Sequence, residues 1–169
     1  IVISGLELTT DNQAIAFPSL VLGTDDINIV TLHGQVGKYA GGVQAEQISL
    51  NSLRNKNIDY LALGHVHSYV KEKLDYRGVY CYPGCLEGRG FDECGPKGFV
   101  LLDIDENTRR IQTEFIPAAA RTLYNLEVDV TSVMTTREAA ARMEQAVTEA
   151  AYPSGSLVKF VLTGEVEVD

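Results

Sequence analysis

The chain has 169 residues, of which 45% are hydrophobic, and it carries a formal net charge of −9. This apolar content suffices for a packed core and argues against a disordered chain. The negative charge disfavours a broad basic surface that would bind nucleic acid by neutralising phosphates, but it permits a site where bound divalent cations meet the phosphate. No apolar run approaches the roughly 20 residues of a membrane-spanning helix, and no signal peptide is recognisable. The sequence therefore predicts a soluble, cytoplasmic protein.

The predicted elements of the first part of the chain alternate short apolar runs with turn residues. This pattern indicates an α/β unit that passes into an antiparallel meander. A glycine-rich loop is expected at 34–42 and a short helix at 47–55. Both histidine motifs of the chain follow predicted strands directly. These predicted strands span residues 1–8, 27–32, 60–63, 79–82, 98–104 and 111–116.

The pattern changes after residue 120, where a small β-α-β unit is predicted. Residues 124–130 and 158–162 alternate apolar and polar side chains, as half-buried strands do. Between them, residues 135–138 fit a capping box, and the apolar helical face that follows ends at Tyr152-Pro153. The expected division is therefore a first domain at 1–120 and a capping-like unit at 121–169.

The three histidines of the chain are its strongest chemical signal. His65 and His67 follow an apolar strand, and alternate strand residues point to the same side, roughly 6 to 7 Å apart. That separation suits two cations about 3.5–4 Å apart better than one. His33, at the end of another strand, offers a third nitrogen to the same sheet edge. The alternatives are surface histidines without a ligand role and a mononuclear zinc hydrolase, for which the usual H-E-x-x-H motif is absent.

The cysteines and the charged loop residues give weaker signals. Cys81, Cys85 and Cys94 lack the paired spacing of a zinc site and the density of a disulfide scaffold, which predicts free thiols in a reducing compartment. Cys85 has no histidine nearby in sequence apart from those above, so a catalytic thiol is a weak hypothesis. The charged residues Arg89, Asp92 and Glu93 are interpreted as a solvated turn.

Four segments together resemble a known family. They are Leu32-His33-Gly34, Asp59 to His67 with its Gly-His-x-His, Tyr82 to Glu93, and Gly95-Pro96-Lys97-Gly98-Phe99. In this order and spacing they resemble the C-terminal half of calcineurin-like metallophosphoesterases, in particular the SbcD-like DNA repair exonuclease branch. The resemblance covers about residues 27 to 104. It implies the C-terminal half of a β-sandwich flanked by helices, and the tail more loosely resembles the family's capping domain.

The resemblance also implies a function and its ligands. It implies a site for two divalent metal ions, most commonly Mn²⁺, with His33 and His65 on one ion and His67 on the other. The implied reaction is hydrolysis of DNA phosphodiester bonds, and the implied partners of the parent enzyme are an SMC-like ATPase subunit and a second copy of itself. Cys85 stands where such sequences commonly carry serine, which indicates a divergent subgroup.

The family's N-terminal motifs, Asp-x-His, Gly-Asp and Gly-Asn-His-Asp/Glu, do not occur in this sequence. The chain also opens inside an apolar run, Ile1-Val2-Ile3. The expectation is therefore a piece of a longer enzyme that is inactive alone and self-associates through bare strand surface; no catalytic residue is assigned within it. Two alternatives stay open, a nucleotide or cyclic-nucleotide phosphoesterase and a non-catalytic scaffold with the same fold.

Overall fold

The computed structural model describes residues 1–9, 11–37 and 47–165 of a mixed α/β chain. The chain divides into two compact units, one made of residues 1–86 and 98–117 and the other of residues 87–97 and 118–169. The main boundary between the two units thus follows residue 117, close to the domain boundary expected after residue 120. The segment 87–97 belongs to the second unit. Within the described ranges, no helix is long and apolar enough to cross a membrane.

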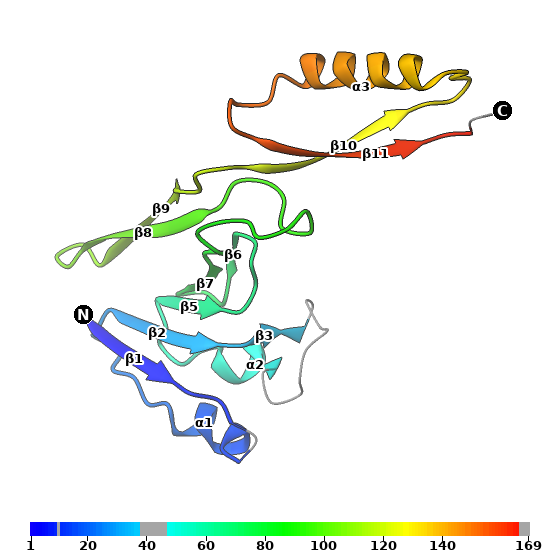
Figure 1. Cartoon of the computed structure of the whole chain (residues 1–169). Helices are drawn as coiled ribbons and strands as arrows, with labels where there is room; N and C mark the ends of the chain where they lie inside the picture. The colour runs from blue at the N-terminus through cyan, green and yellow to red at the C-terminus, as the bar shows by residue number, and fades with distance from the viewer. Residues whose placement is uncertain (10, 38–46, 166–169) are drawn as a thin grey trace. The chain divides into compact units, whose positions relative to one another are not determined.

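The first unit is built on a five-stranded sheet (Figure 1). Its strand order is β1 (Val2–Leu6), β2 (Asn28–His33), β5 (Tyr60–Gly64), β7 (Val79–Tyr82) and β6 (Val70–Lys73). The first four strands are parallel, and β6 pairs with β7 in the antiparallel sense. The carboxyl ends of β2 and β5 therefore meet at one edge of the sheet, where both histidine motifs begin.

Both faces of this sheet are covered, which explains the continuous apolar runs of its central strands. One face packs against the short helices α1 (Gln13–Ser19) and α2 (Leu50–Leu53). The opposite face carries Tyr60 and Cys81 and packs against apolar residues of the next hairpin. The fully buried side chains of the first face include Val30, Leu53, Ile58, Leu61 and Tyr82.

That hairpin consists of β8 (Gly98–Asp105) and β9 (Arg110–Pro117), which pair only with each other among the described strands. Its residues alternate between half-buried and exposed, so one face lies on the sheet and the other meets solvent. A further parallel pair of two residues each, β3 (Gln35–Val36) and β4 (Gln47–Ile48), completes the unit.

The second unit contains the predicted β-α-β arrangement. β10 (Leu123–Asp129) and β11 (Leu157–Thr163) form a parallel pair, and α3 (Thr136–Ala150) packs along it (Figure 1). The capping prediction for this helix is confirmed, because the Thr135 side chain accepts a hydrogen bond from the Glu138 N–H at 3.2 Å.

The structure differs from the predicted elements in four places. Residues 13–19 form a helix and Val70–Lys73 form a strand, and neither element was predicted. The helix expected at 47–55 is only the four residues of α2, preceded by β4. Part of the predicted glycine-rich loop is the short strand β3, and its residues 38–42 lie outside the described residues.

Candidate metal centre

The structure brings His33 and His65 together at the carboxyl edge of the sheet. In the register of β2 and β5, Leu32 lies beside Leu63 and His33 beside Gly64, so His65 follows directly at the same edge. The two imidazole rings meet edge to face, with centroids 5.4 Å apart and an interplanar angle of 83°. His33 is exposed and His65 half-buried, so both nitrogen-bearing rings lie at the surface of this edge.

Gly64 makes this pairing possible. A Cβ atom at this position would lie 2.9 Å from Nδ1 of His33, closer than a side chain can approach without displacing the ring. The two strand ends are also tied together, because the N–H of Gly34 donates a hydrogen bond of 3.1 Å to the carbonyl oxygen of Gly64. The glycine of the Gly-His-x-His motif therefore leaves the space that the His33 ring occupies.

His65 holds an unusual backbone conformation, with φ at 111°. A non-glycine residue in this region costs on the order of 1–3 kcal/mol, and such strain persists mainly at functional sites. β5 ends at Gly64, so His65 and His67 lie in a bend rather than on the strand. The alternation on which the prediction of a common side rests therefore does not reach these residues, because β5 ends before His65.

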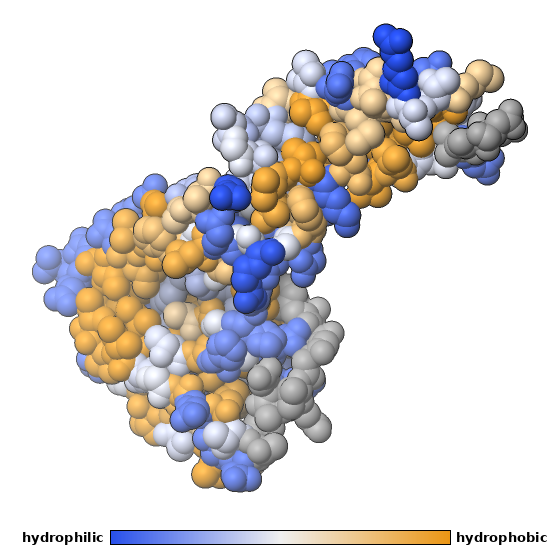
Figure 2. Space-filling view, in the orientation of Figure 1, coloured by the Kyte–Doolittle hydropathy of each residue, from blue (hydrophilic) through white to orange (hydrophobic). Residues whose placement is uncertain are grey.

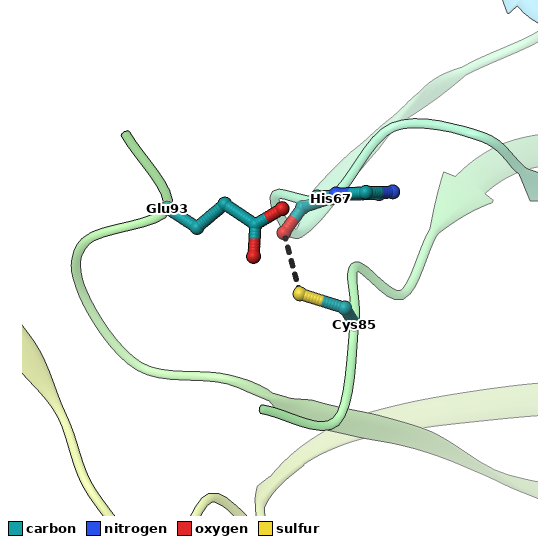
Figure 3. Close-up of side chains that lie close together, drawn as sticks. All are labelled: His67, Cys85 and Glu93. Atoms are coloured by element: carbon teal, nitrogen blue, oxygen red, sulfur yellow. Dashed lines mark hydrogen bonds between the residues drawn. The ribbon is translucent and has the colours of Figure 1, made fainter. Parts of the chain in front are cut away.

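His67 is exposed and lies two positions after His65 in the same bend. Figure 3 shows it with Cys85, whose thiol donates a hydrogen bond of 3.6 Å to the His67 carbonyl oxygen. His67 and Cys85 both belong to the first unit, so this contact lies within one unit. Glu93, which Figure 3 also draws, belongs to the second unit.

Two loop residues have surroundings that the sequence did not reveal. No partner was assigned to Cys85, yet its thiol contacts the His67 carbonyl oxygen, 18 positions earlier in the chain. Glu93 is 12% exposed rather than solvated, and it accepts a hydrogen bond of 2.9 Å from the backbone N–H of Arg89. The solvated-turn interpretation fits the Arg89 side chain, which is 74% exposed.

A broad cavity of about 690 Å³ opens beside the histidine pair, within the first unit. Its polar rim includes His33 and the exposed Glu7, a carboxylate that directly follows β1. Sequence analysis missed Glu7 because it was placed inside the predicted strand 1–8. The apolar wall contains residues of β5 and β8, namely Tyr60, Ala62, Val100 and Leu102.

Apolar side chains also reach the surface of this unit (Figure 2). Ile1 is 53% exposed and Ile3 is 70% exposed, both at the β1 margin of the sheet.

The residues gathered at this edge have the chemistry of divalent-cation ligands. Imidazole nitrogen binds zinc, iron and related ions, whereas carboxylate oxygen is also suited to manganese and magnesium.

A search of the sequence against models of protein families finds no matching family.

Proposed function

We propose that this chain contributes part of the active centre of a two-metal phosphodiesterase of the calcineurin-like type, in a DNA repair exonuclease. In this proposal Mn²⁺ is the native metal, His33 and His65 serve one ion, and His67 serves the other. The observation that carries the proposal is the edge contact of the His33 and His65 rings, 5.4 Å apart at adjoining ends of two parallel strands.

The assignment of His67 to a second ion rests on the family resemblance. Neighbouring imidazoles can each serve one of two cations about 3.5–4 Å apart. The bound metals would supply an activated water and positive charge against the phosphoryl oxygens. Local cationic charge also accounts for how a chain of net charge −9 meets a phosphodiester, because only the site must be positive.

The proposal assigns the chain three imidazoles and leaves other parts of the centre to the parent enzyme. Two-metal sites also need a bridging carboxylate, and the family motifs that supply it are not among these residues. We therefore expect the 169-residue chain alone to hydrolyse little DNA. An SMC-like ATPase subunit and a second copy are the proposed partners of the parent.

The direct test is Mn²⁺-dependent digestion of end-labelled linear DNA by the full-length parent and by its variant with His65 and His67 changed to alanine. Digestion by the parent and loss in the folded variant is the expected result. A parent that folds, binds Mn²⁺ and leaves the DNA intact would contradict the nuclease assignment. Robust turnover by the 169-residue chain that survives His65→Ala would contradict its inactivity.

A nucleotide or cyclic-nucleotide phosphoesterase is the second candidate, and the net charge of −9 favours it because small substrates need no basic surface. Comparing turnover of DNA with that of mononucleotides and cyclic nucleotides separates the two enzymes. A non-catalytic scaffold is the third candidate, and failure of the parent to bind any divalent ion would support it.

A further inference from the structure

A second polar cavity lies in the first unit, near the amino-terminal ends of β5 and β7 and thus away from the histidines. Its volume is about 160 Å³, which at about 30 Å³ per molecule corresponds to roughly five waters. Three cationic side chains and one carboxylate line it, together with a hydroxyl and two apolar residues: Lys71, Arg77, Arg109, Asp59, Thr113, Val79 and Ile111. We propose that this cavity binds a small oxyanion of the phosphate class.

The single carboxylate of the cavity is already committed to one of the three cations. Arg77 donates from Nε and Nη2 to the two oxygens of Asp59, at 2.9 and 2.8 Å. Both side chains are largely buried, at 14% and 16% exposure. The hydrogen bond to Asp59 is the main reason that the pKa of Arg77 is raised. The Asp59 charge is therefore matched within this pair, and among the described residues neither Lys71 nor Arg109 has an ion-pair partner.

Arg109 lies close to Arg77, and the two guanidinium groups share their acceptors. The Nη2 atoms of both guanidinium groups donate to the carbonyl oxygen of Asp26, at 2.6 Å from Arg77 and 2.7 Å from Arg109. Both residues also donate to the carbonyl oxygen of Thr24. Two like charges this close repel each other unless an anion is near. Arg109 lies in the turn between β8 and β9. Its backbone φ is 58°, a conformation that non-glycine residues rarely adopt.

Lys71 supplies the third positive charge from β6, where its ammonium group hydrogen-bonds the hydroxyl of Thr113 on β9. In the part of the chain that the structure describes, Lys71 and Arg109 therefore donate only to neutral oxygens. Further N–H groups of Arg109 are available to an oxyanion. Charge-assisted hydrogen bonds from a guanidinium and an ammonium are the usual means of holding phosphate.

A small anion fits this cavity better than a nucleic-acid backbone does. Polyanion binding relies on several phosphate contacts spread over a basic surface, and the chain as a whole carries −9. A single phosphate group meets only the local charge, which is positive. Free phosphate and a phosphomonoester share this chemistry, and the cavity is proposed for the phosphate group common to both.

The test uses the 169-residue chain titrated with inorganic phosphate and with chloride at matched ionic strength, followed by calorimetry and by amide chemical shifts. We expect saturable phosphate binding with shifts at Thr113 and Ile111. Arg109→Gln and Lys71→Gln should each weaken binding about tenfold or more, the loss of one charge-assisted hydrogen bond. Arg110→Gln is the matched control, because Arg110 is exposed and points away from the half-buried face of β9; its binding should equal that of wild type.

Three results would overturn the proposal. One is a phosphate response no larger than that of chloride, and another is equal weakening by Arg110→Gln and Arg109→Gln. The third is a duplex DNA that shifts the same amides and outcompetes phosphate, which would make the cavity part of a polyanion surface instead. Amide spectra of the variants show whether each is folded, and a glucose 6-phosphate titration then shows whether phosphomonoesters bind as free phosphate does.

Discussion

Replacing Gly64 by alanine tests the histidine pair without removing a histidine. The added Cβ would lie 2.9 Å from Nδ1 of His33, so the ring must shift from its present position. The backbone itself tolerates alanine, because Gly64 is not among the residues with positive φ. The change therefore alters the position of one proposed ligand and leaves the chemistry of both rings intact.

The expected effects on stability and on metal binding have opposite signs. Glycine within a strand costs roughly 0.5–1 kcal/mol relative to alanine, so the free energy of unfolding should be unchanged or slightly higher. Displacing a residue that orients a metal ligand typically lowers affinity about 10- to 100-fold, and a similar loss of Mn²⁺ affinity is expected here. A variant that is as stable as wild type but binds Mn²⁺ poorly would separate the site from the fold.

Calorimetric titration of Mn²⁺ into the purified chain measures the affinity, and urea unfolding measures the stability. Gly5→Ala is the matched control, because it adds the same methyl group to β1, two strands away in the same parallel sheet, 3.4 Å from the Thr31 hydroxyl. Equal Mn²⁺ affinity in Gly64→Ala, Gly5→Ala and wild type would refute the assignment of His33 as a ligand.

Three further changes test the stabilising contacts of the fold. Asp75→Asn should lower the free energy of unfolding by about 1.5 kcal/mol at neutral pH. Burial would raise the pKa of Asp75, but hydrogen bonds from three backbone N–H groups outweigh this effect and hold the pKa below 3.8. In urea unfolding, the advantage of the wild type should therefore be full above pH 3.8 and disappear as the pH falls through the folded-state pKa. Arg77→Met should cost about 3 kcal/mol, because it leaves the Asp59 carboxylate buried without its partner, and a smaller cost for the double variant with Asp59→Leu would identify that charge as the cause. Thr135→Ala should lower stability by about 1 kcal/mol through loss of the α3 cap, whereas Thr135→Ser, which can still accept from the Glu138 N–H, should restore it in thermal unfolding followed by circular dichroism.

Long apolar or alternating runs were predicted well because the residues themselves determine the element. The alternation of residues 124–130 and the capping residue Thr135 together predict β10 and α3, and both are confirmed. β6 was missed because Lys71 and Lys73 are charged, which suits a strand at the margin of a sheet but gives no apolar signal. α1 was missed because Pro18 argues against a helix, although tertiary packing of Phe17 holds it.

The sequence predicts the candidate site only to the extent that it predicts which strands are neighbours in the sheet. That His33 and His65 share a sheet edge follows from both motifs ending apolar strands, once those strands are parallel neighbours. The position of His67 depends on where β5 stops and on the φ of His65, which no sequence pattern specifies. The contact of Cys85 with His67 likewise depends on the course of the chain between them.

The two edge strands of the five-stranded sheet, β1 and β6, differ in charge and exposure. This difference determines which of them can pair with an additional strand. β6 presents three exposed charged residues, whose burial beside another strand would be costly, so this margin resists pairing. β1 presents Ile1, Val2 and Ile3, all exposed and none charged, and its outer backbone groups have no strand beside them among the described residues. We therefore expect any further strand, from this or another molecule, to pair with β1, so that β6 stays an edge strand.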